Sequence, residues 1–317
     1  MKAVILSGGA GTRLREISGD CPKPMMPLLG KPLLEHTVSL LRENGFNRLC
    51  VTLHYQPEII RQFLGNGERF GVSIEYRMET EPLGTAGAVR NCRSFIGEDA
   101  VLVMSGDSAC DYDLASLFRS HSAGVTIALA VHAEPLAYGL VVTDRTGRVT
   151  GFVEKPAWER VVTDHVSTGI YVLSPDVLDR VPEGVRYDFA KDLFPRLLAE
   201  GVPLYGRIME GYWCDIGTPR AYYQCNLDAI DGLYRLPGQS GEARRVIPCR
   251  DRARLMRAMS EALAEFGADL SDGLTLSSQN GSAHLAPLPD RAALSLEGDP
   301  AAVRAIEALA RRLEREA

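Results

Sequence analysis

Residues 3–14 read Ala3-Val4-Ile5-Leu6-Ser7-Gly8-Gly9-Ala10-Gly11-Thr12-Arg13-Leu14, a short apolar run followed directly by a glycine-rich segment. The apolar run predicts a buried strand. The glycines let the backbone approach a ligand closely and turn its N–H groups toward phosphate oxygens. Arg13 and the following Pro22-Lys23-Pro24 add fixed positive charge. We therefore expect an anionic ligand, a nucleoside triphosphate, at the end of this strand.

Two other phosphate-binding motifs also follow a strand, and neither matches this segment. The dinucleotide fingerprint requires a third glycine where Leu14 stands, and the Walker loop requires Gly-Lys-Ser/Thr where Arg13-Leu14-Arg15 stands. A simple oxidoreductase and a P-loop enzyme are therefore excluded. A tight glycine turn with a solvated Arg13 is the plain structural alternative, and the continuation into Pro-Lys-Pro argues against it.

Composition limits the size of the expected ligand and the expected location of the protein in the cell. The chain has 317 residues and a net charge of -6, which argues against a nucleic-acid polymer as partner because phosphate backbones are met by strongly basic surfaces. The phosphate ligand should therefore be small. No run approaches the roughly 18 apolar residues of a membrane span, so we expect a cytoplasmic protein without membrane contact. Seven cysteines without a C-x-x-C pair indicate neither a zinc site nor a disulfide framework.

Short apolar segments alternate with amphipathic ones over residues 1–232, which is typical of an α/β domain with a mainly parallel sheet covered on both faces. In such a sheet, ligands bind outside the carboxyl ends of the strands. The expected strands are 3–6, 48–53, 72–76, 100–104, 125–130, 149–153 and 166–173, and the expected helices are 32–44, 56–63, 85–92, 114–121, 189–200 and 219–230.

A second, smaller unit is expected after this domain. Residues 233–248 lack periodicity and contain Pro237-Gly238, which indicates a linker. Residues 249–317 then show the order α-β-β-β-α of a compact α+β domain. Its helices are expected at 250–266 and 301–315, and its strands near 274–277, 283–287 and 293–296.

Two aspartates are candidate metal ligands. Asp107 follows the buried strand that ends at Met104, and Asp215 lies in Trp213-Cys214-Asp215. Magnesium prefers one or two carboxylates together with substrate phosphates, so the pair suits that ion beside a triphosphate site. Taken singly, each aspartate would be read as a turn or helix-cap residue, and their occurrence with the glycine loop favours the metal site.

Other motifs are placed to contact ligands. Glu154-Lys155-Pro156 ends a predicted strand and offers a charged pair for a second phosphate or a sugar hydroxyl, with a surface ion pair as the alternative. Gly139 and Thr168-Gly169 permit close ligand approach, although a plain bulge explains each equally well. Residues 81–87 cap a predicted helix, and their backbone could contact a nucleobase edge.

These motifs together resemble the sugar-nucleotide pyrophosphorylases, and among them most closely the mannose-1-phosphate guanylyltransferases. The resemblance covers residues 1–232 and departs at Glu16, Ser105 and Ser167, where the family has proline, asparagine and asparagine. It implies a Rossmann-like, mixed but mainly parallel sheet. The motifs that carry it are the glycine loop with Arg13 and Lys23, Gly30-Lys31-Pro32, residues 81–87, Gly106-Asp107, Tyr138-Gly139, Glu154-Lys155-Pro156, Thr168-Gly169 and residues 213–218.

The resemblance also implies a reaction: an oxygen of a sugar 1-phosphate attacks the α-phosphorus of a nucleoside triphosphate, which gives an NDP-sugar and pyrophosphate. Arg13, Lys23 and Asp107 would be catalytic, and Asp107 and Asp215 would hold magnesium. The nucleotide would contact Leu6, Ser7, Gly8, Gly9, Gly11, Thr12, Glu81, Gly84 and Thr85, and the sugar phosphate would contact Gly139, Glu154, Lys155, Thr168 and Gly169.

Three questions stay open on the sequence alone. GTP with mannose 1-phosphate is the leading substrate pair, but uridylyl, adenylyl or thymidylyl transfer would use the same loop and metal. A non-catalytic subunit that binds nucleotide sugars is the alternative to an enzyme. Residues 249–317 resemble the last domain of phosphohexomutases, but Ala286-Pro287-Leu288-Pro289-Asp290-Arg291-Ala292 lacks the family's phosphate loop. We therefore expect that domain to serve structure or homo-oligomer formation.

Overall fold

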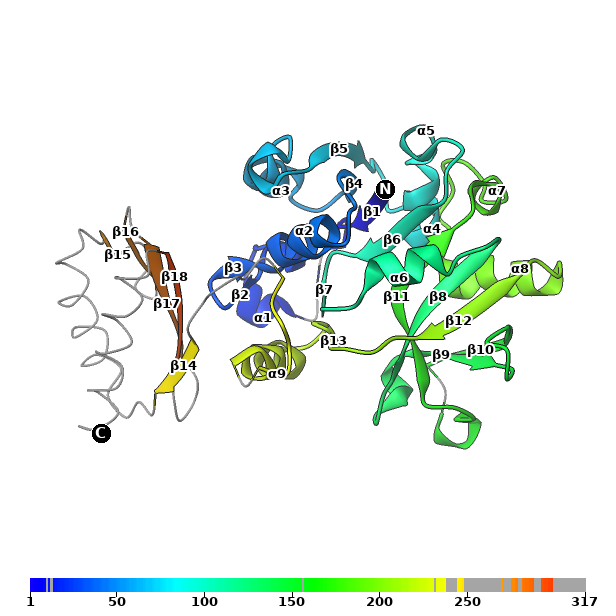
Figure 1. The fold of residues 1–317 in the computed structure, drawn as a ribbon. Helices are drawn as coiled ribbons and strands as arrows, with labels where there is room; N and C mark the ends of the chain where they lie inside the picture. The colour runs from blue at the N-terminus through cyan, green and yellow to red at the C-terminus, as the bar shows by residue number, and fades with distance from the viewer. Residues whose placement is uncertain are drawn as a thin grey trace. The chain divides into compact units, whose positions relative to one another are not determined.

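The computed structural model describes residues 1–9, 11, 14–155, 157–230 and 232–237, together with five later strands. Contacts divide the chain into two units (Figure 1). The first unit comprises Met1–Met26 and Leu33–Ala221, and the second comprises Pro27–Pro32 and Tyr222–Ala317.

The first unit is built on a mixed sheet with the order β10-β9-β11-β6-β1-β4-β5, in which β8 pairs with β11 and β12 pairs with β8. The central strands β6, β1, β4 and β5 are parallel, whereas β11 is antiparallel to β6. This arrangement confirms the predicted α/β fold class. The strands are β1 Lys2–Leu6, β4 Arg48–Leu53, β5 Ser73–Met78, β6 Val101–Ser105, β8 Val125–Val131, β9 Gly139–Thr143, β10 Val149–Glu154, β11 His165–Leu173 and β12 Leu204–Ile208.

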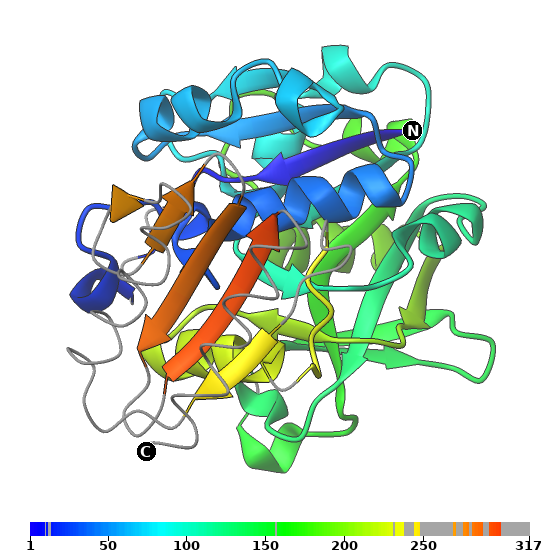
Figure 2. The same cartoon turned by 60° about the vertical axis from the view of Figure 1, so that its left-hand side comes forward.

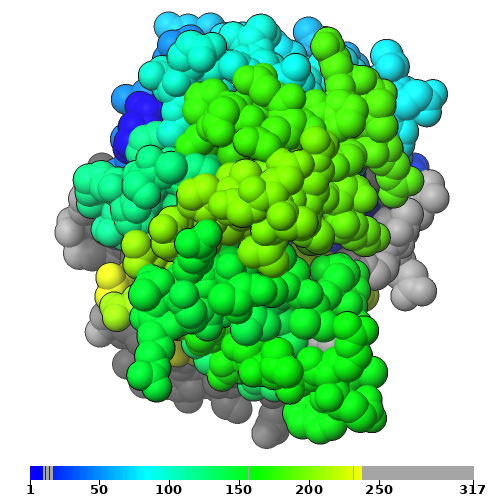
Figure 3. Space-filling view, turned by 90° about the vertical axis from the view of Figure 1, so that its right-hand side faces the viewer, coloured from blue at the N-terminus to red at the C-terminus, as the bar shows by residue number. Residues whose placement is uncertain are grey.

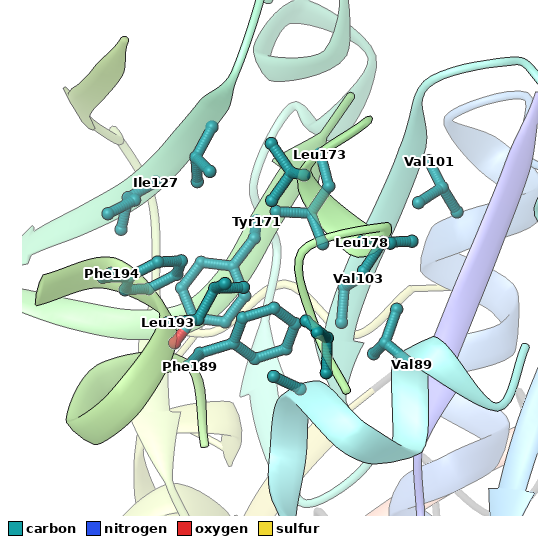
Figure 4. Close-up of a cluster of buried hydrophobic side chains, with 14 of the residues drawn as sticks. Val89, Val101, Val103, Ile127, Tyr171, Leu173, Leu178, Phe189, Leu193 and Phe194 are labelled. Atoms are coloured by element: carbon teal, nitrogen blue, oxygen red, sulfur yellow. The ribbon is translucent and has the colours of Figure 1, made fainter. Parts of the chain in front are cut away.

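Helices cover both faces of this sheet, which is why its central strands are continuous apolar runs. Ala3 and Ile5 belong to a buried cluster that includes residues of α2 (Leu33–Glu43), which lies along β1 (Figure 2). Val4 points to the other face and belongs to a second cluster, where Tyr171, Phe189 and Phe194 pack together (Figure 4). The alternation of side chains along each strand thus fills two cores.

Each of the six predicted helices overlaps a helix of the structure, with one difference in type, whereas three short helices at 15–18, 93–96 and 175–178 were not predicted. The segment predicted as one helix over 189–200 is a π-helical turn, η6, followed by α8. Pro195 has no N–H to donate to the carbonyl four residues earlier, which accommodates the wider turn. The helices are α1 Arg15–Ser18, α2 Leu33–Glu43, α3 Pro57–Leu64, α4 Gly84–Arg90, α5 Arg93–Ile96, α6 Leu114–Arg119, α7 Pro175–Leu178, η6 Phe189–Leu193, α8 Phe194–Ala199 and α9 Pro219–Ile230; shorter 3-10 turns are η2 Lys23–Met25, η3 Glu68–Phe70, η4 Pro135–Ala137 and η5 Trp158–Arg160.

The space-filling view shows one face of the first unit, on which the green and yellow-green segments that include β9, β10 and α8 form most of the surface (Figure 3). Within the part of the chain that the structure describes, no helix has the length and apolar character needed to cross a membrane.

The second unit contains a hairpin and a separate sheet. The hairpin strands β2 Pro27–Leu28 and β3 Lys31–Pro32 contact α9, where Tyr222 Oη donates to Pro27 O at 2.6 Å and Leu29 N donates to Asn226 Oδ1 at 3.3 Å. The sheet is antiparallel, with the order β14-β18-β17-β16-β15. Its strands are β14 Arg244–Ile247, β15 Asp269–Leu270, β16 Thr275–Ser278, β17 Gly281–Pro287 and β18 Ala292–Gly298.

The strands β16, β17 and β18 overlap the three segments predicted as strands of the small domain. The stretch 233–248 was predicted as a linker. Its residues Arg244–Ile247 instead form the strand β14, because they pair with β18. The predicted helices at 250–266 and 301–315 lie outside the described residues. The division into domains 1–232 and 249–317 stays a prediction.

Candidate active site

The glycine loop and Asp107 follow the carboxyl ends of two strands, β1 and β6, and Glu79 follows β5. β1 and β6 are parallel neighbours with Leu6 opposite Ser105, so the glycine loop and Asp107 leave the sheet side by side. Gly106 N donates to Leu6 O at 2.9 Å and joins the two loops. Ligands of open α/β sheets bind at this edge.

A cavity of about 220 Å³ lies between these loops. Ser7 bounds it with a buried side chain, and its N–H donates to Thr52 O at 3.2 Å, which ties the start of the loop to β4. The cavity is lined by Leu6, Ser7, Gly9, Gly11, Leu14, Lys23, Pro24, Asp107 and Gly217.

Two glycines of the loop leave no room for side chains. Gly11 has φ of 60°, and a Cβ there would lie 2.9 Å from Lys23 Cβ. A Cβ at Gly8 would lie 3.0 Å from Glu79 Oε1. Glycine is thus required at position 11 by its backbone conformation, and at position 8 a side chain would have to push the Glu79 carboxylate aside. The predicted ligand contacts of Thr12 and Arg13 lie outside the described residues.

The buried side chain of Lys23 connects the two predicted metal ligands. Its Nζ donates to Asp107 Oδ2 at 2.6 Å and to Asp215 Oδ1 at 3.1 Å. Burial by itself lowers the pKa of Lys23, but the two carboxylates outweigh burial and the pKa is raised. Lys23 is therefore a charged group held inside the site.

A short antiparallel ladder positions the two aspartates. β7 (Ser108–Cys110) pairs with β13 (Trp213–Asp215), and Asp215 lies opposite Ser108 (Figure 1). Beyond the ladder, Tyr212 N donates to Asp111 Oδ1 at 2.6 Å. The ladder brings together residues that are more than 100 positions apart in the sequence.

Asp107 is ionised in this setting. Burial alone would raise its pKa, but the ammonium of Lys23 and a hydrogen bond from Ser105 Oγ hold the pKa of Asp107 below its usual range. Both carboxylates accept hydrogen bonds from one nitrogen, so they face a common position. Oxygen donors of this kind fit a magnesium ion, with phosphate and water oxygens completing its coordination.

The residues described in the structure include no group of three or more His, Cys, Asp or Glu side chains arranged around a metal position.

Glu79 is a buried carboxylate beside the glycine loop that sequence analysis did not select. It follows β5 directly, is buried, and its Oε2 accepts a hydrogen bond from Leu83 N at 3.0 Å. Burial raises the pKa of Glu79. Its carboxylate lies against Gly8, whereas the predicted base contact Glu81 is exposed. The strand was expected to end at Tyr76, and its true end at Met78 would have indicated Glu79.

Gly84 and Thr85 contact a different segment. A Cβ at Gly84 would lie 2.8 Å from Tyr187 O, and Thr85 Oγ1 donates to Asp188 Oδ1 at 3.2 Å. The N–H groups of Ala86 and Gly87 both donate to Tyr187 O. The start of α4 is therefore fixed by residues 187–188, and its nucleotide contacts stay a prediction.

Gly139 and Glu154 lie together, as expected. They are opposite each other in β9 and β10, and a Cβ at Gly139 would lie 2.8 Å from Glu154 Oε2. Lys155 follows with φ of 41°, a conformation that costs energy in a non-glycine residue and often marks a functional position. Its side chain is exposed, and its N–H donates to Tyr138 O at 3.2 Å.

Thr168 and Gly169 form a bulge in β11, where the register with β8 shifts. Gly169 has φ of 76°, and the bulge brings it beside Ser105. Thr168 Oγ1 donates to Ala128 O at 2.8 Å, and Trp213 Nε1 donates to Thr168 O at 3.2 Å. Trp213 thus connects the bulge to the strand that carries Asp215.

Comparison with known proteins agrees with this geometry. Residues 2–232 match the family described as nucleotidyl transferase. The chain belongs to the nucleotidyl transferase family. The match includes the glycine loop, both aspartates and the bulge in β11.

Relatives with curated names fall into more than one substrate class. UTP--glucose-1-phosphate uridylyltransferase of Synechocystis sp. is 39% identical over 240 residues, which are 71% of this chain and 62% of that protein. Mannose-1-phosphate guanylyltransferase of Mycobacterium tuberculosis is 37% identical over 243 residues, which are 75% of this chain and 67% of that protein. The chain thus spans about two thirds of the length of these relatives.

Solved structures show the same fold. HddC of Yersinia pseudotuberculosis, complexed with GMP-PN, is 29% identical and superposes with a TM-score of 0.63 over 72% of this chain and 99% of that one. A putative glucose-1-phosphate thymidylyltransferase of Bacillus anthracis is 26% identical, with a TM-score of 0.65 over 72% of this chain and 95% of that one.

Proposed function

We propose that this chain transfers a nucleotidyl group from a nucleoside triphosphate to a sugar 1-phosphate. The observation that carries the proposal is the meeting of Asp107 and Asp215 on one cation position beside the glycine loop. Transfer at phosphorus requires mainly positioning and neutralisation of charge. Magnesium bound by the two carboxylates would neutralise charge that develops on the triphosphate.

Other residues of the chain bind the triphosphate, stabilise the leaving group and bind the sugar phosphate. The glycine loop binds the triphosphate through backbone N–H groups, and Lys23 with Arg13 stabilises the departing pyrophosphate. Lys155 holds the phosphate of the sugar, and Glu154, whose carboxylate fits against Gly139 because glycine has no side chain, accepts hydrogen bonds from sugar hydroxyls.

GTP and mannose 1-phosphate are our proposed substrates. A carboxylate only accepts hydrogen bonds, and the guanine edge offers two neighbouring donors, N1–H and the 2-amino group. Uracil and thymine place carbonyl oxygens on both sides of one N–H, so a buried carboxylate repels them. Glu79, buried against Gly8, therefore supports guanine. The relatives include several guanylyltransferases as well as a uridylyltransferase, so the choice of base rests on Glu79.

The test is pyrophosphate release by the purified chain with magnesium, measured over all pairs of four nucleoside triphosphates with mannose, glucose and glucosamine 1-phosphates. We expect release with GTP and mannose 1-phosphate. Release with another pair would correct the substrates and leave the reaction type intact. No release from any pair would contradict catalysis and favour the alternative, a subunit that only binds nucleotide sugars.

A further inference from the structure

Lys23 occupies the position between Asp107 and Asp215 that the metal would need. We propose that Lys23 acts as an internal cation: it holds the two carboxylates together in the nucleotide-free protein and keeps a divalent metal out until a triphosphate arrives. This inference rests on the proposed metal site and adds an order to its assembly, in which metal and triphosphate enter together.

Electrostatics explains why the ammonium lies there. Two carboxylates close to each other repel when both are ionised, and one positive charge between them removes that repulsion. The Lys23 side chain is only 8% exposed, so its ammonium depends on these partners in place of water. A buried ion that loses its partners is strongly destabilising. Among the described residues, Asp107 and Asp215 are the acceptors of the Lys23 ammonium, so a metal that arrives alone must displace a charge that has no other acceptor there.

The triphosphate supplies that acceptor. Lys23 lines the same cavity as Gly9 and Gly11, and its Cβ packs against Gly11 of the glycine loop. Phosphate oxygens in this cavity would form charge-assisted hydrogen bonds with the ammonium. A lysine side chain is flexible, so its head group can move from the carboxylates to the phosphates while the backbone stays in place.

Removal of the Lys23 charge tests the inference through metal binding alone. The full chain, free of nucleotide, is titrated with Mn²⁺, and free Mn²⁺ is followed by electron paramagnetic resonance. We expect Lys23→Gln to bind Mn²⁺ at least about tenfold more tightly than the wild type, because two unpaired carboxylates attract the cation. The matched control is Lys191→Gln, an exposed lysine, which should bind Mn²⁺ like the wild type. Equal affinity in Lys23→Gln and the wild type would overturn the inference.

A second substitution locates the bound metal. Asp107→Asn in the Lys23→Gln background should abolish the gain in Mn²⁺ affinity, and a retained gain would place the metal elsewhere and overturn the inference. Thermal unfolding covers the case in which Lys23→Gln is unstable. Mn²⁺ should raise the unfolding temperature of this variant more than that of the wild type, or restore its fold if it unfolds without metal. No such rescue contradicts the internal-cation role.

The Mn²⁺ titration and the pyrophosphate-release test can fail independently of each other. If the wild type releases pyrophosphate and Lys23→Gln gains no Mn²⁺ affinity, only the role of Lys23 is wrong. If no pair of substrates releases pyrophosphate, the proposed function is wrong, and the Mn²⁺ titration still decides whether Lys23 competes with a cation.

Discussion

The carboxylate of Glu79 is buried beside the glycine loop, and burial raises its pKa. The folded protein therefore holds this proton at a higher pH than the unfolded chain, so the ionised group costs stability above the ordinary pKa of glutamate and the cost disappears as the pH falls. We expect Glu79→Gln to stabilise the chain at neutral pH more than near pH about 4. Denaturant unfolding at both pH values checks this, and an equal effect at both would show that ionisation of Glu79 costs nothing.

The same substitution tests whether Glu79 recognises the guanine base. If Glu79 recognises guanine, Glu79→Gln should lower the ratio of kcat/KM for GTP to that for UTP by about tenfold or more, because the amide places a donor against a guanine donor. Glu81→Gln is the matched control, two residues away and exposed. A drop in the ratio for Glu81→Gln alone would instead support the original prediction for Glu81.

The ladder between β7 and β13 is the element that sets the distance between the two aspartates. Tyr212 N donates to Asp111 Oδ1, and Gly211 allows this approach because a Cβ there would lie 2.5 Å from that oxygen. Asp111→Ala should destabilise the chain by about 1 kcal/mol and raise the magnesium concentration needed for half-maximal rate. Asp111→Asn keeps the accepting oxygen and should restore most of the magnesium response. An unchanged response in Asp111→Ala would show that the ladder holds without it.

Local patterns predicted β1, β6, β10 and β11, which carry many of the site residues, but not the short strands β7, β9 and β13 or the contacts between elements. The strand at 3–6 and the glycines after it are recognisable because backbone conformation restricts the residue types there. The contact of Lys23 with Asp107 and Asp215 joins residues 84 and 192 positions apart, and no local pattern encodes such separations. The attachment of α4 to Tyr187 escaped prediction for the same reason, since residues 187–188 have no motif of their own.

The sheet beyond residue 243 belongs to the second unit, and its role is open to a direct test. Removal of residues 238–317 deletes β14 together with its partner β18 and keeps the family match at 2–232. We expect the shortened chain to show a smaller oligomer or a lower unfolding temperature, because this unit is proposed to serve assembly or stability. Light scattering and calorimetry check the outcome, and unchanged size and stability would contradict that role.

The proposal for the whole molecule depends on a metal-assisted transfer at Asp107 and Asp215. The most direct measurement is the initial rate of pyrophosphate release from GTP and mannose 1-phosphate with magnesium, compared between the wild type and Asp107→Asn. We predict measurable release by the wild type and a loss of at least about a hundredfold in the variant, with an unchanged circular dichroism spectrum. Equal rates in the two proteins would contradict the assignment of this carboxylate pair as the catalytic centre.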